Sequence, residues 1–397
     1  MEENLNQPPR YQRYMNWSRT ATNLTDIVRH GTVQTCQLIQ QLRKRIDNIF
    51  IDSTTNQDTN PPYFLHLMCG DGTTSTLIKS CFQQIGFDRI RAKGIELCEE
   101  RIQLWKSKLS SDDCIYDYDL IEEGFNFEQF SGNSDTNQHD GQRNQPISIF
   151  WQFSTSYLYT MNDNTCGTPA EFTDQPRLKS ALLSIHHQLA SNGIAFLTDL
   201  CPGLMGVLTS YFSKRSCPYG TLALIHACQK EGIPYSVITM KDIIPLPQVN
   251  DNVEKIITAE KLDKACADDQ ARQVWDILEF ISHTPLEEIG MEDFLKLQFP
   301  AFTFQHYNWQ RRKQYYQGYQ LLAKFCSHQL PLYYQTIVLT SRQGLTELVN
   351  QIHQQVADIN RQTNVEIDFD QVAEFKSQFV ELLDPQGPSE SSTFQFT

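Results

Sequence analysis

The fold is decided by one stretch of the chain, FLHLMCGDGT at residues 64–73, which runs into an alcohol-rich segment, TST at residues 74–76. The short apolar run predicts a buried parallel strand, and the alcohol-rich segment predicts the start of a helix. Between them, Gly70 permits a tight turn, and Gly72 is expected to leave room for a ligand against the backbone. A strand, a glycine turn and a helix in this order predict a nucleotide-type binding site.

A second strand strengthens this prediction. The segment Lys93-Gly-Ile-Glu96 reads as a strand that ends on a carboxylate, 24 positions (96 minus 72) after Gly72. In α/β folds, an acidic residue at about this distance binds ribose hydroxyls. Ser75 stands where an NAD-type G-x-G-x-x-G site has its third glycine, so a dinucleotide is less well matched. The alternative is an ordinary glycine turn with a surface glutamate.

Strand-like and helix-like segments alternate along most of the chain, which predicts a doubly wound, mostly parallel α/β sheet of seven strands. The expected strands are 63–68, 92–96, 114–118, 147–153, 194–200, 235–240 and 335–340, and the expected helices between them are 74–84, 99–109, 176–189 and 221–231. Another helix is expected at 27–46, before the first strand.

The same pattern predicts six parts. They are a disordered head at 1–12, an N-terminal helical lid at 13–55, a ligand-binding core at 56–246 plus 331–342, a helical insert at 247–330, a C-terminal extension of two amphipathic helices at 343–383 and a disordered tail at 384–397. Insertions on such folds usually lie over the ligand face, so the insert is expected to act as a substrate lid.

Composition excludes several classes of protein. With 33 Lys plus Arg against 47 Asp plus Glu, the net charge is −14, which disfavours a nucleic acid as the main partner. No apolar run approaches the roughly 20 residues that span a bilayer, and no secretory signal opens the chain. The eleven cysteines contain no C-x-x-C, so reduced thiols in the cytoplasm and no zinc or other metal site are expected.

The apolar strand with Cys69-Gly-Asp-Gly72, followed by Ile95-Glu-Leu97, resembles motif I and the acidic motif of the class I S-adenosylmethionine-dependent methyltransferases. The resemblance covers residues 60–245 and 335–340 and implies a Rossmann-like core that binds S-adenosylmethionine (SAM) and releases S-adenosylhomocysteine (SAH). The positions it implies for cofactor binding are Gly70, Asp71, Gly72 and Thr73 on the methionine and ribose side, Glu96 on the ribose hydroxyls, Asp117 or Asp119 at the adenine end, and Gln152 on the fourth strand.

Within this superfamily, the order of parts is similar to that of the histamine N-methyltransferases. The shared parts are a helical lid, motif I, the segment IELCEERIQLWK at 95–106, the segment IFWQ at 149–152 and a helical insert containing Trp275. The acid with which that family grips its amine falls at Asn16, so histamine itself is not expected as the substrate.

Methyl transfer from a sulfonium is an in-line displacement that depends mainly on positioning. For an amine acceptor, a partly desolvated pocket favours the neutral, nucleophilic form. The candidate catalytic residues are Gln152 and Tyr157, and the candidate substrate-binding residues are Tyr14 and Trp17 from the lid and Asp199 at a strand end. Tyr157 can instead pack on a helix, and Asp199 can instead cap a loop.

These observations predict N-methylation of a small amine or peptide, with the oligomeric state left open. Two alternatives remain: methylation of a protein that docks on the C-terminal extension, and an inactive methyltransferase fold that serves as an interaction module. His66 is expected to be a core histidine. The basic and aromatic segment 306–319 could stack bases or belong to a lid, but is typical of an amphipathic helix with a charged outer face.

Overall fold

The computed structural model describes residues 22–46, 49–50, 61–67, 69–96, 99–110, 114–120, 146–153, 176–200, 203–212, 220–261, 268–282, 286–297, 302–359 and 367–383. A seven-stranded sheet lies at the centre, in the order β3-β2-β1-β4-β5-β7-β6. The strands are β1 (Tyr63–Leu67), β2 (Ile90–Glu96), β3 (Cys114–Leu120), β4 (Ile147–Phe153), β5 (Leu189–Leu200), β6 (Tyr235–Pro245) and β7 (Gln329–Thr340). β7 runs antiparallel to both of its neighbours, and the other paired strands are parallel. The predicted fold class is confirmed.

The last two strands are longer than the sequence pattern predicts. β6 continues to Pro245 and β7 begins at Gln329, and the two pair with one another past the point where β5 ends. The polar Lys241 and the proline at Pro331 interrupt the apolar pattern, which is why these ends were missed. We call the paired ends of the two strands, residues 241–245 and 329–333, the β6–β7 arm. Pro331 is tolerated there because β6 is the only described strand that pairs with this part of β7.

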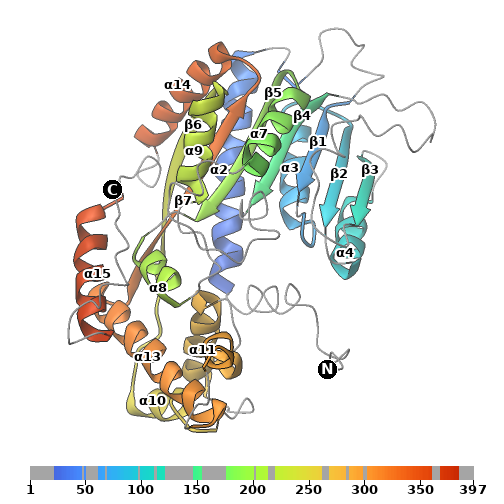
Figure 1. The fold of residues 1–397 in the computed structure, drawn as a ribbon. Coiled ribbons are helices and arrows are strands. Elements are labelled where there is room, and N and C mark those ends of the chain that lie inside the picture. Colours follow the sequence, from blue (N-terminus) through green and yellow to red (C-terminus); the bar gives the residue numbers. More distant parts are fainter. Residues whose placement is uncertain are drawn as a thin grey trace.

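Helices cover both faces of the sheet (Figure 1). One face carries α2 (Thr22–Arg45), α3 (Thr73–Gln84), α4 (Glu99–Leu109) and α14 (Gln343–Ile359), and the other carries α7 (Pro176–Gln188) and α9 (Gly220–Glu231). An apolar core fills each interface, and the helices supply residues at the helical spacing that the sequence shows. Among the described residues, no helix is long and apolar enough to cross a membrane.

The helical insert joins β6 to β7 and comprises α10 (Asp251–Ile257), α11 (Asp269–Ser282), the short η2 (Leu286–Glu288), α12 (Met291–Leu295) and α13 (Phe304–Phe325). β6 runs in the same direction as β5, β4 and β1, so the insert leaves the sheet at the edge where those strands end. Figure 1 shows α10, α11 and α13 grouped beyond that end of the sheet.

Within the insert, α13 does not present a fully charged outer face. Arg312 is only 1% exposed. Its Nε donates to Asn308 Oδ1 at 2.8 Å, and its Nη1 donates to the carbonyl of Ile257 at 2.8 Å, at the end of α10. Carbonyls at the end of a helix attract a cation, so Arg312 fastens α13 to α10 instead of facing solvent. The sequence-based expectation was wrong at this residue.

The C-terminal extension is part of the folded body. α14 packs on α2 and on the β6–β7 pair, and α15 (Phe369–Leu383) packs on α13 and on α8 (Leu204–Phe212), a helix that the sequence pattern did not predict. Phe375 of α15 is fully buried, with its ring centroid 5.2 Å from that of Phe325. The apolar face of α15 is therefore occupied by the chain's own insert.

Candidate functional site

The glycine turn lies between the end of β1 and the start of α3. Gly70 and Gly72 have φ angles of 59° and 88°, in the left-handed region that favours glycine. The backbone N–H of Gly70 donates to Glu96 Oε2 at 2.7 Å, and the N–H of Cys69 donates to the carbonyl of Ile95 at 3.1 Å. Glu96 is fully buried at the tip of β2. The turn and the predicted acidic residue are therefore joined directly.

The space beside Gly72 is filled by Trp105 of α4. A Cβ on Gly72 would lie 2.9 Å from the Cα of Trp105, and one on Gly94 would lie 2.7 Å from its Cε2. Both glycines are therefore needed so that α4 can approach β2 and the turn. The room left by the missing Cβ of Gly72 is taken up by a tryptophan 33 positions away (105 minus 72), so a ligand at Gly72 would have to contact its backbone from another side.

Three buried side chains form a hydrogen-bonded network behind the turn. Trp105 Nε1 donates to Ser75 Oγ at 2.8 Å, and Ser75 Oγ lies 2.7 Å from His66 Nδ1. Burial lowers the pKa of His66 to about 3, so the ring is neutral. Since the hydroxyl accepts from Trp105, its own proton is available to His66 Nδ1. His66 is the core histidine that was predicted. The hydrogen-bonded network links β1, α3 and α4.

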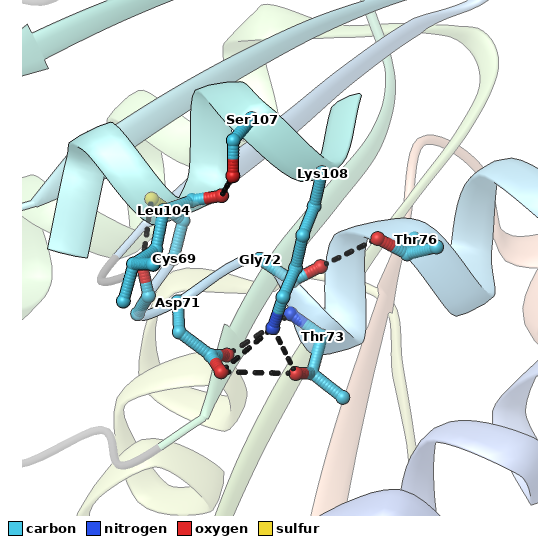
Figure 2. Close-up of polar contacts among 9 residues, drawn as sticks. Cys69, Asp71, Gly72, Thr73, Thr76, Leu104, Ser107 and Lys108 are labelled. Atoms are coloured by element: carbon cyan, nitrogen blue, oxygen red, sulfur yellow. Dashed lines mark hydrogen bonds and ion pairs between the residues drawn. The ribbon is translucent and has the colours of Figure 1, made fainter. Parts of the chain in front are cut away.

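Two of the predicted turn residues are tied to α4 by their side chains, as Figure 2 shows. Lys108 Nζ lies 2.8 Å from Asp71 Oδ2 and 2.8 Å from Thr73 Oγ1, and Asp71 Oδ1 accepts from the N–H of Thr73 at 3.1 Å. Burial alone would raise the pKa of Asp71, but the hydrogen bonds from Lys108 and Thr73 outweigh it and lower the pKa. Asp71 is thus an ionised residue that caps the start of α3.

Strand register brings Gln152 to the same edge of the sheet. Gln152 of β4 pairs with Leu67 at the end of β1, and its side chain is fully buried. β1 lies between β2 and β4, so the glycine turn has Glu96 on one side and Gln152 on the other. The strand order reverses at β1 and β4, and ligands of open α/β sheets bind at such a point, outside the carboxyl ends of the strands.

For the other predicted site residues, the structure gives the position along a strand or no position at all. Asp199 is half-buried on β5, two residues past Leu197, which pairs with Gln152. Asp117 lies on β3 opposite Lys93, whereas Asp119 lies one register position from the tip of β2. The structure describes the backbone of both β3 residues but not their side chains. Tyr14, Trp17 and Tyr157 lie outside the described residues.

One residue at this edge was not predicted. Arg101, the third residue of α4, is only 7% exposed, and its Nη1 lies 3.5 Å from the position that a Cβ on Gly70 would take. A signal for it exists in the sequence. Arg101 falls four positions before Trp105 and seven before Lys108, which places all three on one helix face.

The strand order, the antiparallel seventh strand and the glycine turn at the strand-order reversal together show the fold. It is a Rossmann-like α/β fold, which is the fold implied by the resemblance to the class I SAM-dependent methyltransferases.

Comparisons with known proteins add distant structural neighbours. No protein-family model matches the chain, and no curated protein matches its sequence. Among solved structures, the chain is similar to the plantazolicin methyltransferase BpumL in complex with SAH, with 11% identity and a TM-score of 0.33 over 85% of this chain and 92% of that chain. It is also similar to a TehB-like SAM-dependent methyltransferase from Corynebacterium glutamicum, with 11% identity and a TM-score of 0.28 over 57% of this chain and 86% of that chain. A SAM-dependent methyltransferase from Clostridium acetobutylicum matches with 11% identity and a TM-score of 0.27, over 45% of this chain and 53% of that chain.

Proposed function

We propose that this chain is a methyltransferase that binds SAM at the carboxyl edge of the sheet and methylates nitrogen in a small amine-containing substrate. The observation that carries the proposal is the contact between the N–H of Gly70 and the carboxylate of Glu96, at 2.7 Å, beside the strand-order reversal. A carboxylate at the second strand tip is the group with which such folds hold ribose hydroxyls. The fold supplies the turn and the acid together.

The remaining cofactor contacts follow from the same edge. Glu96 would accept hydrogen bonds from the ribose hydroxyls, and the backbone of Gly70 would lie against the methionine side. The side chains of Asp71 and Thr73 are engaged by Lys108, so these residues would contribute through their backbone. Asp117 or Asp119 on β3 would lie toward adenine, and the register favours Asp119.

Bound SAM would supply an electrophilic methyl group on its sulfonium. The protein's part is to hold an acceptor nitrogen in line with that methyl group and to keep the nitrogen neutral. We assign the positioning of the acceptor to Gln152 and Tyr157, because Gln152 lies near the end of the strand next to the glycine turn. Asp199, Tyr14 and Trp17 would bind the rest of the substrate, and the insert would cover it.

The test is calorimetric titration of the full chain with SAH and, separately, with NAD. We expect SAH to bind and NAD to bind more weakly, because Ser75 replaces the third glycine of a dinucleotide site. Tighter binding of NAD would contradict the proposal. Transfer of a labelled methyl group from SAM to a panel of primary, secondary and heterocyclic amines then tests the acceptor class. SAH binding without transfer to any amine or protein would favour the inactive interaction module.

Methylation of a docked protein would require a different surface from the one expected. Phe375 and Phe379 of α15 are buried against the insert, so the apolar face of the extension is not available. On α15, a docked protein could use the polar face or the exposed apolar residues Phe369 and Leu382. The small-amine proposal needs no such surface.

A further inference from the structure

Arg101 is a largely buried cation in the first turn of α4. The side chain is 7% exposed, and within the described part of the chain no hydrogen bond or ion pair holds its guanidinium. The other cation at the turn, Lys108, is paired with Asp71 at 2.8 Å. Taking a charge out of water costs several kcal/mol per ion unless an opposite charge compensates for it. Among the described residues, no carboxylate forms an ion pair with Arg101, so its guanidinium is available to an anionic ligand.

The position of Arg101 in its helix makes the cost larger. It lies in the first turn of α4, where the helix dipole favours acidic residues such as the neighbouring Glu99 and Glu100. A cation in the first turn is disfavoured, and burial weakens the compensation by solvent.

The surroundings of Arg101 point to a ligand. Its Nη1 lies 3.5 Å from the Cβ position of Gly70, and the N–H of the same glycine donates to Glu96. Gly70 is thus close to both a carboxylate and a guanidinium, at the edge where the proposed cofactor binds. A ligand held at this edge would have a negative and a positive group within reach.

We infer that Arg101 binds the carboxylate of the methionine portion of SAM, an inference that rests on the proposed function. SAM carries one carboxylate, whereas its ammonium and sulfonium are cations and its adenosine is neutral. A guanidinium fork matches a carboxylate with two parallel N–H donors. Glu96 would hold the ribose and Arg101 the carboxylate, with the glycine turn between them.

The experiment pairs two ligands with two proteins. SAH and its decarboxylated analogue, S-adenosyl-3-thiopropylamine, are titrated by calorimetry into the wild-type chain and into Arg101→Gln. Arg101→Gln should lower the affinity for SAH by about 10- to 100-fold, as expected for the loss of one charge-assisted interaction. It should change the affinity for the analogue by less than about threefold. Lys106→Gln, which removes a cation from the same helix, is the matched control and should change neither affinity.

Equal weakening of both ligands by Arg101→Gln would overturn the inference, because the contact would then be to adenosine. Unchanged SAH affinity in the variant would overturn it as well. If the variant does not fold, as judged by circular dichroism, the wild-type chain decides, because equal affinity for SAH and the analogue excludes a carboxylate contact. Wild-type protein that binds neither ligand would instead refute the proposed function, and the inference with it.

Discussion

The carboxylate of Glu96, the last residue of β2, accepts a 2.7 Å hydrogen bond from the backbone N–H of Gly70, in the turn after β1. The two residues are 26 positions apart in the chain (96 minus 70), and the contact exists because parallel strands end at one edge of the sheet. Glu96 is fully buried, so its carboxylate is held in a single place. This contact is the basis of the cofactor assignment.

Glu96→Gln tests that assignment with little change in size. The amide lacks the charge that strengthens hydrogen bonds to ribose hydroxyls, so SAH affinity should fall by about 10-fold or more. Glu99→Gln, at an exposed position in the first turn of α4, is the matched control. Calorimetry measures both dissociation constants. An unchanged constant for Glu96→Gln would falsify the ribose assignment.

Gly94→Ala should destabilise the fold through Trp105. The new methyl group would lie 2.7 Å from Trp105 Cε2 and 2.9 Å from Cys69 Sγ, and such overpacking costs about 1–3 kcal/mol. Gly344→Ala is the control, because a Cβ there meets nothing within 4 Å and alanine favours the helix that contains it. Urea unfolding should show a lower free energy of unfolding for Gly94→Ala and an unchanged or higher one for Gly344→Ala. Similar free energies for both would show that Trp105 is free to move.

His66 should make stability depend on pH. Burial lowers its pKa from 6.5 to about 3, so below pH 6.5 the unfolded chain takes up a proton that the folded chain refuses. The stabilisation is fully present above pH 6.5 and is lost as the pH falls toward 3, at about 1.4 kcal/mol per pH unit.

The measurement is the free energy of unfolding in urea between pH 7 and pH 5, for wild type and for His66→Gln. The slope of the unfolding free energy against pH should be smaller for His66→Gln, because the contribution of His66 is lost. His226→Gln, at an exposed position on α9, should keep the slope of wild type. A His66→Gln slope equal to that of wild type would mean that His66 is protonated in the folded protein.

Phe375→Ala should show that the C-terminal extension belongs to the folded body. Its ring is fully buried against Phe325, and truncating such a phenylalanine costs about 3–5 kcal/mol. Phe369→Ala, in the same helix at 61% exposure, should change the unfolding free energy by less than about 0.5 kcal/mol. Equal small effects would instead indicate that α15 detaches, which would revive the docking alternative.

Much of this architecture could be predicted because its signals are local. Apolar runs of strand length, helical spacing and the Gly70–Gly72 turn each act over a few residues, and they were enough to predict the class of the sheet. The β6–β7 arm was missed for the same reason. Its polar residues and Pro331 carry no strand signal, and each strand there is stabilised by the other.

The sequence by itself determined that the chain forms a doubly wound sheet with a glycine turn and an acidic residue at neighbouring strand tips. Only the tertiary structure decided what surrounds them. Trp105 fills the space beside Gly72 and Gly94, and the guanidinium of Arg101 lies beside Gly70. These contacts join residues 11 to 33 positions apart (105 minus 94 and 105 minus 72), and they depend on how α4 packs on the sheet and not on any local pattern.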